Sequence, residues 1–239
     1  MRRMPACNIC GGSAFGAGPS GRLAETGLAS RCLTCGSLER HRVAREIIDA
    51  IRSPAHFAAY RLMRFSPDPI VDESWFASSE LSIYGGDNSL DLQAIDRPDF
   101  AYDVIICSHV LEHVGDDNRA LGELVRILSP QGFLILIVPR VLTGTMTEDW
   151  GFPDPAKNFH YRGYGRDFDA RLVNTLPNIH IVAAALPDPV TGDIKRIHVL
   201  TKSAFWRDRL LANVSAARRI DNWQAMLTQG SLASRSLDG

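Results

Sequence analysis

Four cysteines near the start of the chain have the spacing of a metal site. They form two CxxC pairs, at Cys7, Cys10, Cys32 and Cys35. Each CxxC turn can present both sulfurs to one point, so four thiolates can close a tetrahedral zinc site. Gly11, Gly12 and Gly36 follow the pairs, where a turn around a metal favours a residue that tolerates positive φ. A four-cysteine site has no open coordination position, so we expect a structural zinc ribbon, with a redox pair or an iron–sulfur cluster as the alternatives.

Two histidines are the candidates for proton transfer. His109 follows an apolar run, and its imidazole titrates near neutral pH, so it could serve as a base or orient a substrate. The alternative is a polar lining residue that touches a ligand only through its backbone. His160 is the preferred general base and Arg162 the preferred anion contact, in a polar segment where the alternative is a lid that merely packs.

The position of His109 depends on the strands and the helix expected around it. Residues 104–107 are a continuous apolar run, residues 117–128 show helical apolar spacing, and residues 133–138 are a second apolar run. Two buried strands that bracket a helix form a right-handed βαβ unit in a mostly parallel sheet. Ligands of such sheets bind at the carboxyl ends of the strands, which is where Ser108 and His109 stand.

The segments YDVIICSHVLEHV and ALGELVRILSPQGFLILIVP resemble the LEH-box subgroup of class I S-adenosylmethionine (SAM)-dependent methyltransferases, of the methyltransferase type 11-like kind. A second stretch, Thr147 to Leu172, resembles the segment after strand five in a bacterial subset of these proteins. The resemblance implies an α/β fold with a Rossmann-like seven-stranded sheet, mostly parallel, that closes with an antiparallel hairpin over residues 179–185 and 197–200. It also implies SAM as the cofactor.

The resemblance implies cofactor contacts at several positions. Ser108 and His109 would line the methionine side, Asp87 would bind the ribose diol and Asp91 the adenine amino group. Asp87 follows an expected helix at 74–79 and an expected strand at 81–84, and it could instead be a plain turn former beside two glycines. The family's first loop is usually rich in glycine, but the corresponding residues 61–72 contain none. We interpret Ser66, Pro67, Asp68 and Pro69 as a variant turn after a strand that includes Phe65, with Phe65, Ser66 and Pro67 as cofactor contacts; the alternative is a lost site.

The composition describes one globular domain with small additions. The 239 residues carry a net charge of −1, and no apolar run approaches the roughly 20 residues of a membrane span, so we expect a cytoplasmic protein. We divide the chain into a zinc module (1–40), a methyltransferase-like domain (41–202) and a helical tail (203–239), which packs on its own domain or on a second copy in a homodimer. Residues 37–51 read as a helix capped by Ser37, and its basic residues are expected to form a solvated face or, less favoured, a surface for phosphate or nucleic acid.

The sequence therefore predicts a SAM-dependent methyltransferase. A small metabolite, sugar or peptide is the favoured acceptor by default, and nucleic acid is less favoured. Methylation of DNA adenine in particular is disfavoured, because no proline-rich aromatic tetrad is present. Two alternatives stand beside it. One is a non-catalytic binding protein that keeps the fold with a degenerate cofactor loop, and the other is an enzyme that the zinc module directs to RNA or protein.

Overall fold

A seven-stranded sheet forms the centre of the molecule. The computed structural model describes residues 5–139 and 146–220. The strands of the sheet lie in the order β11-β9-β10-β6-β5-β3-β4. They are β3 (Arg61–Arg64), β4 (Ser78–Leu81), β5 (Tyr102–Ser108), β6 (Leu128–Ile137), β9 (His180–Pro187), β10 (Ile194–Thr201) and β11 (Ala217–Arg219). β4, β3, β5 and β6 are parallel, whereas β10, β9 and β11 add antiparallel pairs at one edge. The predicted Rossmann-like sheet with its closing hairpin is confirmed.

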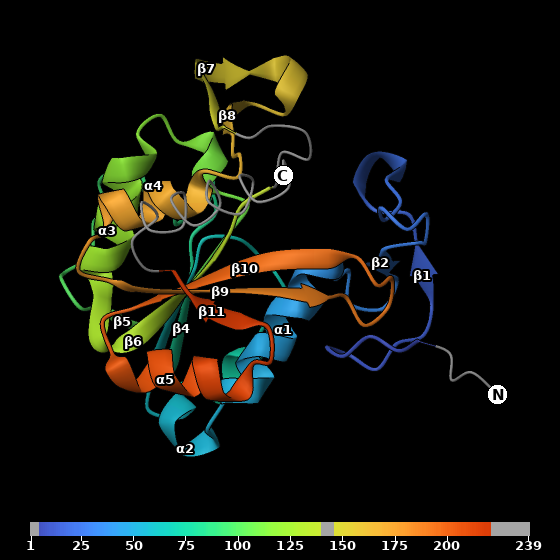
Figure 1. Cartoon of the computed structure of the whole chain (residues 1–239), viewed down its shortest axis with the longest axis horizontal. Helices are drawn as coiled ribbons and strands as arrows, with labels where there is room; N and C mark the ends of the chain where they lie inside the picture. The colour runs from blue at the N-terminus through green and yellow to red at the C-terminus, as the bar shows by residue number, and fades with distance from the viewer. Residues whose placement is uncertain (1–4, 140–145, 221–239) are drawn as a thin grey trace, which may run out of the picture.

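Helices cover both faces of this sheet (Figure 1). One apolar cluster joins α1 (Glu39–Ile51), α2 (Pro54–Phe57) and α5 (Ala204–Asn213) to one face. A second cluster joins α3 (Asp117–Ile127) and α4 (Phe168–Thr175) to the other. Successive side chains of β5 alternate between the two clusters, Val104 and Ile106 in the first, Ile105 and Cys107 in the second. The apolar run at 104–107 is continuous because β5 is covered on both faces.

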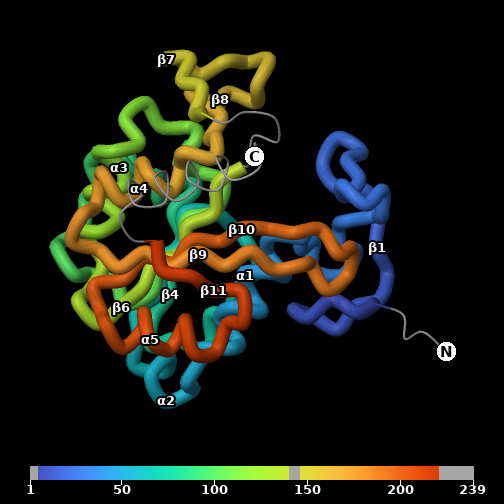
Figure 2. Tube along the Cα trace, in the orientation of Figure 1, coloured from blue at the N-terminus to red at the C-terminus, as the bar shows by residue number. Residues whose placement is uncertain are grey.

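The N-terminal segment is a small lobe that rests on the turn between β9 and β10. It contains the two-stranded sheet of β1 (Phe15–Gly16) and β2 (Arg31–Cys32) and the short helix η1 (Pro19–Gly21). Figure 2 shows the β9–β10 turn reaching this lobe. Asp193 accepts hydrogen bonds there from the backbone N–H groups of Glu25 (2.8 Å) and Thr26 (3.0 Å). The lobe is therefore fixed to the sheet by residues distant in sequence.

A hairpin stands over the carboxyl edge of the sheet. It consists of β7 (Glu148–Asp154), η4 (Pro155–Lys157) and β8 (His160–Gly163). Its strand β8 packs against the 3₁₀ helix η3 (Leu111–His113). Arg162 fixes the two together, because its guanidinium donates to the backbone carbonyls of Val114 at 2.7 Å and Gly115 at 2.5 Å. The hairpin thus takes the covering position that was expected for the segment after strand five.

Three local expectations were wrong. Residues 74–79 do not form a helix, since the 3₁₀ turn η2 (Glu73–Trp75) is followed by β4, and residues 81–84 contain only the end of that strand. Parallel pairing of Ser78 with Arg61 sets this earlier register. Ser37 does not cap α1; Leu38 occupies the cap position, and the Ser37 hydroxyl lies 3.2 Å from the sulfurs of Cys7 and Cys35.

The expected solvated basic face of α1 was also wrong. His41 and Arg42 are buried, at 4% and 0% exposure. Both side chains have carboxylate partners, Asp68 for His41 and Asp188 for Arg42. The tail begins as α5, anchored on the protein's own sheet by buried Trp206 and Leu210. The predicted dimer contact through residues 221–239 lies outside the described residues.

Candidate functional site

The carboxyl ends of β3 and β5 create a crevice. These parallel strands are neighbours, yet the chain leaves β3 towards β4 on one side and leaves β5 towards β6 on the other. Ligands of open α/β sheets bind where the strand order reverses in this way. Ser66 and Asp68 follow β3, and Ser108 and His109 stand at the end of β5. The structure thus brings together Ser66, Ser108 and His109 of the predicted cofactor residues.

Asp68 links this crevice to α1. Its carboxylate accepts a hydrogen bond from the Ser66 hydroxyl at 2.7 Å and lies 2.8 Å from Nε2 of His41. Burial alone would raise the pKa of Asp68, but His41 and the hydroxyls of Ser108 and Ser66 lower that pKa well below its usual range. Asp68 therefore carries a negative charge whose contacts with Ser66 and His41 hold the glycine-free first loop in place.

His109 ends β5 in an unusual conformation. Its φ is 55°, in the left-handed region that residues other than glycine seldom adopt, and its backbone N–H donates to the carbonyl of Ile137 at 2.8 Å. Burial and, to a lesser extent, the nearby Arg40 together lower the pKa of its imidazole to about 2. A neutral imidazole of such low basicity is a weak general base at neutral pH but a good polar contact.

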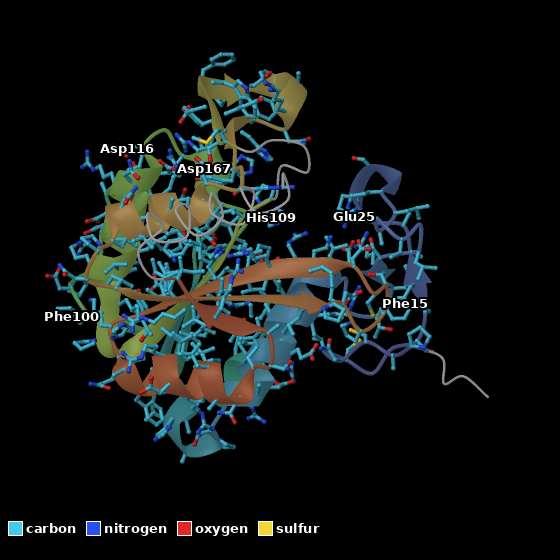
Figure 3. All side chains as sticks on the ribbon, viewed as in Figure 1. Phe15, Glu25, Phe100, His109, Asp116 and Asp167 are labelled. Carbon is cyan, nitrogen blue, oxygen red and sulfur yellow. The ribbon has the colours of Figure 1, made fainter. Side chains whose placement is uncertain are left out.

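A cavity of about 570 Å³ opens beside His109. Its lining includes the apolar residues Ile137, Val138 and Phe168, which lie at the end of β6, directly after β6 and at the start of α4. The N-terminal lobe and the start of α1 supply the facing wall, and Figure 3 shows Glu25 on that wall and His109 at the sheet. The cysteine-bearing lobe is consequently part of the cavity rather than a separate attachment.

Charged side chains ring this cavity. The cationic ones are twice as many as the carboxylates: Arg22, Arg40, Arg166, Lys195, Arg196 and Arg218 against Glu25, Glu39 and Asp169. Several are paired, such as Arg22 with Glu39 at 2.8 Å. Nε of Arg40 is buried and has no hydrogen-bond partner among the described residues. This guanidinium is the first candidate for an anionic group of a ligand.

The remaining predicted cofactor residues are more scattered. Phe65 is in the apolar core at 5% exposure and Pro67 is exposed. Asp87 is exposed in the loop after β4, beside Gly85 at φ 74°. Asp91 is exposed too, and its carboxylate accepts a hydrogen bond from the backbone N–H of Gln93 at 2.9 Å. The structure places the two acids on one loop beyond β4, without bringing them into contact with Ser66.

The four cysteines of the N-terminal lobe do converge. Their sulfurs all lie within 4.8 Å of one another, with 3.8 Å between Cys7 and Cys35 and 3.6 Å between Cys10 and Cys32. Gly11 and Gly36 have positive φ, at 76° and 73°, as the turns were expected to need. Burial would raise the pKa of Cys32, but hydrogen bonds from the backbone N–H groups of Cys35 and Thr34 lower it to about 6. A hydrogen bond from the backbone of Gly12 lowers the pKa of Cys10, but burial and the three neighbouring thiols outweigh it and raise that pKa to about 12. The convergence of four sulfurs on one point, rather than the pKa of any one thiol, is what fits this donor set to zinc.

Neither His160 nor Arg162, the two residues singled out in the hairpin, lines the cavity. His160 is partly buried and its ring lies 4.7 Å from that of His113, so it faces η3 and is not among the residues that line the cavity. The prediction that Arg162 contacts an anion was wrong: its side chain is 2% exposed and donates to Asp149 and to two backbone carbonyls.

Cys107 of β5 is a buried core residue, as expected.

Sequence reasoning missed Arg40, His41 and Glu112 as site residues. Arg40 was assigned to a solvated face, and Glu112 was noted only as part of the family box. The available signal was helical spacing: Arg40 lies three and seven residues before Val43 and Ile47, which places it on the buried face of α1.

Residues 38–170, more than half of the chain, match a family model described as a methyltransferase domain. The chain belongs to this family. The resemblance to SAM-dependent methyltransferases is confirmed, and the protein is a methyltransferase of this fold. The matched segment begins at α1 and ends in α4, so it contains the crevice and the hairpin but not the four cysteines.

Solved structures of similar fold are distant in sequence. A SAM-dependent methyltransferase from Thermotoga maritima, titled a possible histamine N-methyltransferase, is 12% identical, with 68% of this chain and 89% of that chain covered and a TM-score of 0.41. The 1,6-didemethyltoxoflavin-N1-methyltransferase of Burkholderia thailandensis, solved with S-adenosylhomocysteine, is 13% identical, with 69% and 78% covered and a TM-score of 0.46. No curated protein matches the chain. Within the described residues, every helix is too short or too polar to cross a membrane.

Proposed function

We propose that this methyltransferase binds SAM in the crevice at the ends of β3 and β5 and its acceptor in the neighbouring cavity. The observation that carries the proposal is the position of His109, which ends β5 at the crevice and also lines the cavity. Methyl transfer is an in-line displacement, so the protein has to align the sulfonium methyl group with the acceptor atom. A shared wall between the two spaces provides that alignment.

The acceptor is a small molecule that carries an anionic group and an apolar part. A volume of about 570 Å³ is in the usual range of small-molecule pockets and is too small for a folded partner. The excess of cationic side chains favours a carboxylate or a phosphate, and Arg40 is its proposed contact. Ile137, Val138 and Phe168 would cover the apolar part. This assignment favours the predicted metabolite over nucleic acid. Arg22 of the lobe and Arg42 of α1 are already paired with carboxylates within the protein, so neither is left to bind a phosphate backbone.

The cofactor contacts remain as the sequence predicted them. Asp87 would accept from the ribose hydroxyls and Asp91 from the adenine amino group, with Phe65, Ser66 and Pro67 forming the first loop. Ser108 and His109 would border the methionine moiety. His109 and His160 are the bases that the sequence predicts; His109 borders the proposed acceptor site, where its low basicity suits a polar contact, and His160 does not line the cavity. Zinc at Cys7, Cys10, Cys32 and Cys35 would have a structural role and would keep the cavity wall in shape.

Calorimetry with SAM tests the proposal directly. The zinc-loaded chain should bind SAM, and Asp87→Ala should weaken binding by about 10- to 150-fold, because hydrogen bonds to a charged group contribute about 1.5–3 kcal/mol. Asp208→Ala, which changes an exposed acid on α5, is the matched control and should bind like the wild type. A folded, zinc-loaded protein that binds no SAM would instead support the alternative of a non-catalytic binding protein.

A further inference from the structure

Glu112, His113 and His160 form a second cluster of metal-ligating side chains, distant in sequence from the cysteines. One ligand atom from each lies within 4.8 Å of the other two. Glu112 and His113 belong to η3, and His160 is the first residue of β8, so two separate elements converge on one point. Within the described residues, the four cysteines are the only other group of this kind.

The state of Glu112 indicates that the cluster lacks a partner. Its side chain is fully buried at 0% exposure, yet neither carboxylate oxygen has a hydrogen-bond partner among the described residues. The ring Nδ1 of His109 is 3.5 Å from Oε1, too far for a strong hydrogen bond. A buried carboxyl group without partners is costly, and proteins usually give such a group a hydrogen-bond partner or use it to coordinate a metal.

The His113 ring is oriented as a metal ligand would be. Nδ1 of His113 lies 3.3 Å from the backbone carbonyl oxygen of Phe159. A carbonyl can only accept, so Nδ1 carries the proton and Nε2 keeps a lone pair for a metal. Asn158 and Phe159 both have positive φ, at 57° and 61°, and this turn delivers the Phe159 carbonyl to His113 and begins β8 at His160. The His113 side chain is exposed, so an ion can reach the site.

We propose that Glu112, His113 and His160 bind a divalent transition-metal ion. Two imidazoles and one carboxylate are a ligand set for Zn²⁺, Mn²⁺, Fe²⁺ or Co²⁺, whereas Ca²⁺ and Mg²⁺ favour all-oxygen sites. Three protein ligands leave coordination positions open to water or to a ligand oxygen. The ion connects the β7–β8 hairpin to η3 beside the cavity, and its binding does not depend on the proposed SAM and acceptor sites.

Mn²⁺ titration into the zinc-loaded full-length protein tests this site. The electron paramagnetic resonance signal of free Mn²⁺ reports binding, and zinc-filled thiolates do not compete because Mn²⁺ prefers oxygen and nitrogen ligands. We expect one Mn²⁺ per chain in the wild type. Glu112→Gln and His160→Asn should each weaken binding at least tenfold, since even the loss of an outer-shell partner costs about 10- to 100-fold in metal affinity.

His56→Ala is the matched control, because His56 is exposed on α2 and lies outside the cluster. This variant should bind Mn²⁺ like the wild type. Co²⁺ followed by visible absorption provides a second probe, with His160→Asn as the variant least prone to disturb the core. The proposal is overturned by a folded wild type that binds neither ion beyond the cysteine site, or by cluster variants that bind as tightly as His56→Ala. Calorimetry with SAM on the same samples separates this outcome from a failure of cofactor binding.

Discussion

Arg42, at the start of α1 where the N-terminal lobe ends, and Asp188, in the β9–β10 turn, form a buried ion pair that fixes this junction to the sheet. Both side chains are 0% exposed, and the guanidinium donates through Nε to Oδ1 at 2.7 Å and through a terminal nitrogen to Oδ2 at 2.8 Å. Another donor of Arg42 binds the carbonyl of Ser37 at 3.0 Å. Asp188 also accepts from the backbone N–H and the hydroxyl of Thr191. Removing Arg42 therefore leaves a buried carboxylate with only these two neutral donors.

Arg42→Met should lower the free energy of unfolding by about 3–5 kcal/mol, the cost of leaving one buried charge uncompensated. At about 2–4 °C per kcal/mol for a chain of this size, the melting temperature should fall by about 6–20 °C. Equilibrium urea unfolding of the zinc-loaded protein measures the first quantity and thermal melting the second.

Two comparisons make this prediction sharp. Arg45→Met, one turn further along α1, breaks a partly exposed pair with Asp49 and a contact with the Trp75 ring, and should cost only about 1 kcal/mol. Arg42→Met combined with Asp188→Leu replaces the charges by apolar groups and should recover part of the loss. A cost below about 1 kcal/mol for Arg42→Met alone would refute the reasoning that this pair holds the lobe.

Three further predictions concern the metal lobe, the first loop and the core. Cys32→Ser should reduce zinc to less than one ion per chain by elemental analysis and raise protease cleavage between residues 7 and 35, whereas Cys107→Ser, in the core, should retain zinc. Asp68→Asn should be less stable than the wild type at neutral pH. Because the folded state lowers the pKa of Asp68, this difference is present above the unfolded value of about 3.9 and should shrink as pH falls below it; a difference that grows in acid would contradict the assignment. Gly132→Ala should destabilise the protein in urea unfolding, because its Cβ would lie 2.3 Å from the backbone oxygen of Asp103. Gly122→Ala in α3 has open space and should instead stabilise by about 0.5–1 kcal/mol.

The buried half of the sheet could be predicted because its strands are continuous apolar runs. β5 and β6 read directly from residues 104–107 and 133–138. β4 could not be placed in the same way, since it is an edge strand whose serines at 78 and 79 are exposed. An edge strand needs no apolar run, and its register is set by pairing with β3, which is a tertiary contact.

The cysteine cluster was predictable because the four ligands and their spacing are local in the sequence. The cavity was not, because its walls come from residues 22–40, 109, 137–139, 164–169 and 185–218, which only the fold brings together. Basic residues of α1 were misread for a related reason. Sequence shows their charge, but their partners Asp68 and Asp188 stand 27 and 146 residues away.

The contacts of the N-terminal lobe also determine when it can be completed during synthesis. Residues 7–42 are synthesised well before Asp188 and Asp193, the two carboxylates that bind them. Contacts of such long separation form late, because the intervening chain must first be ordered. This segment must therefore wait for the β9–β10 hairpin before it docks. The cavity that the two enclose cannot take its final shape until then.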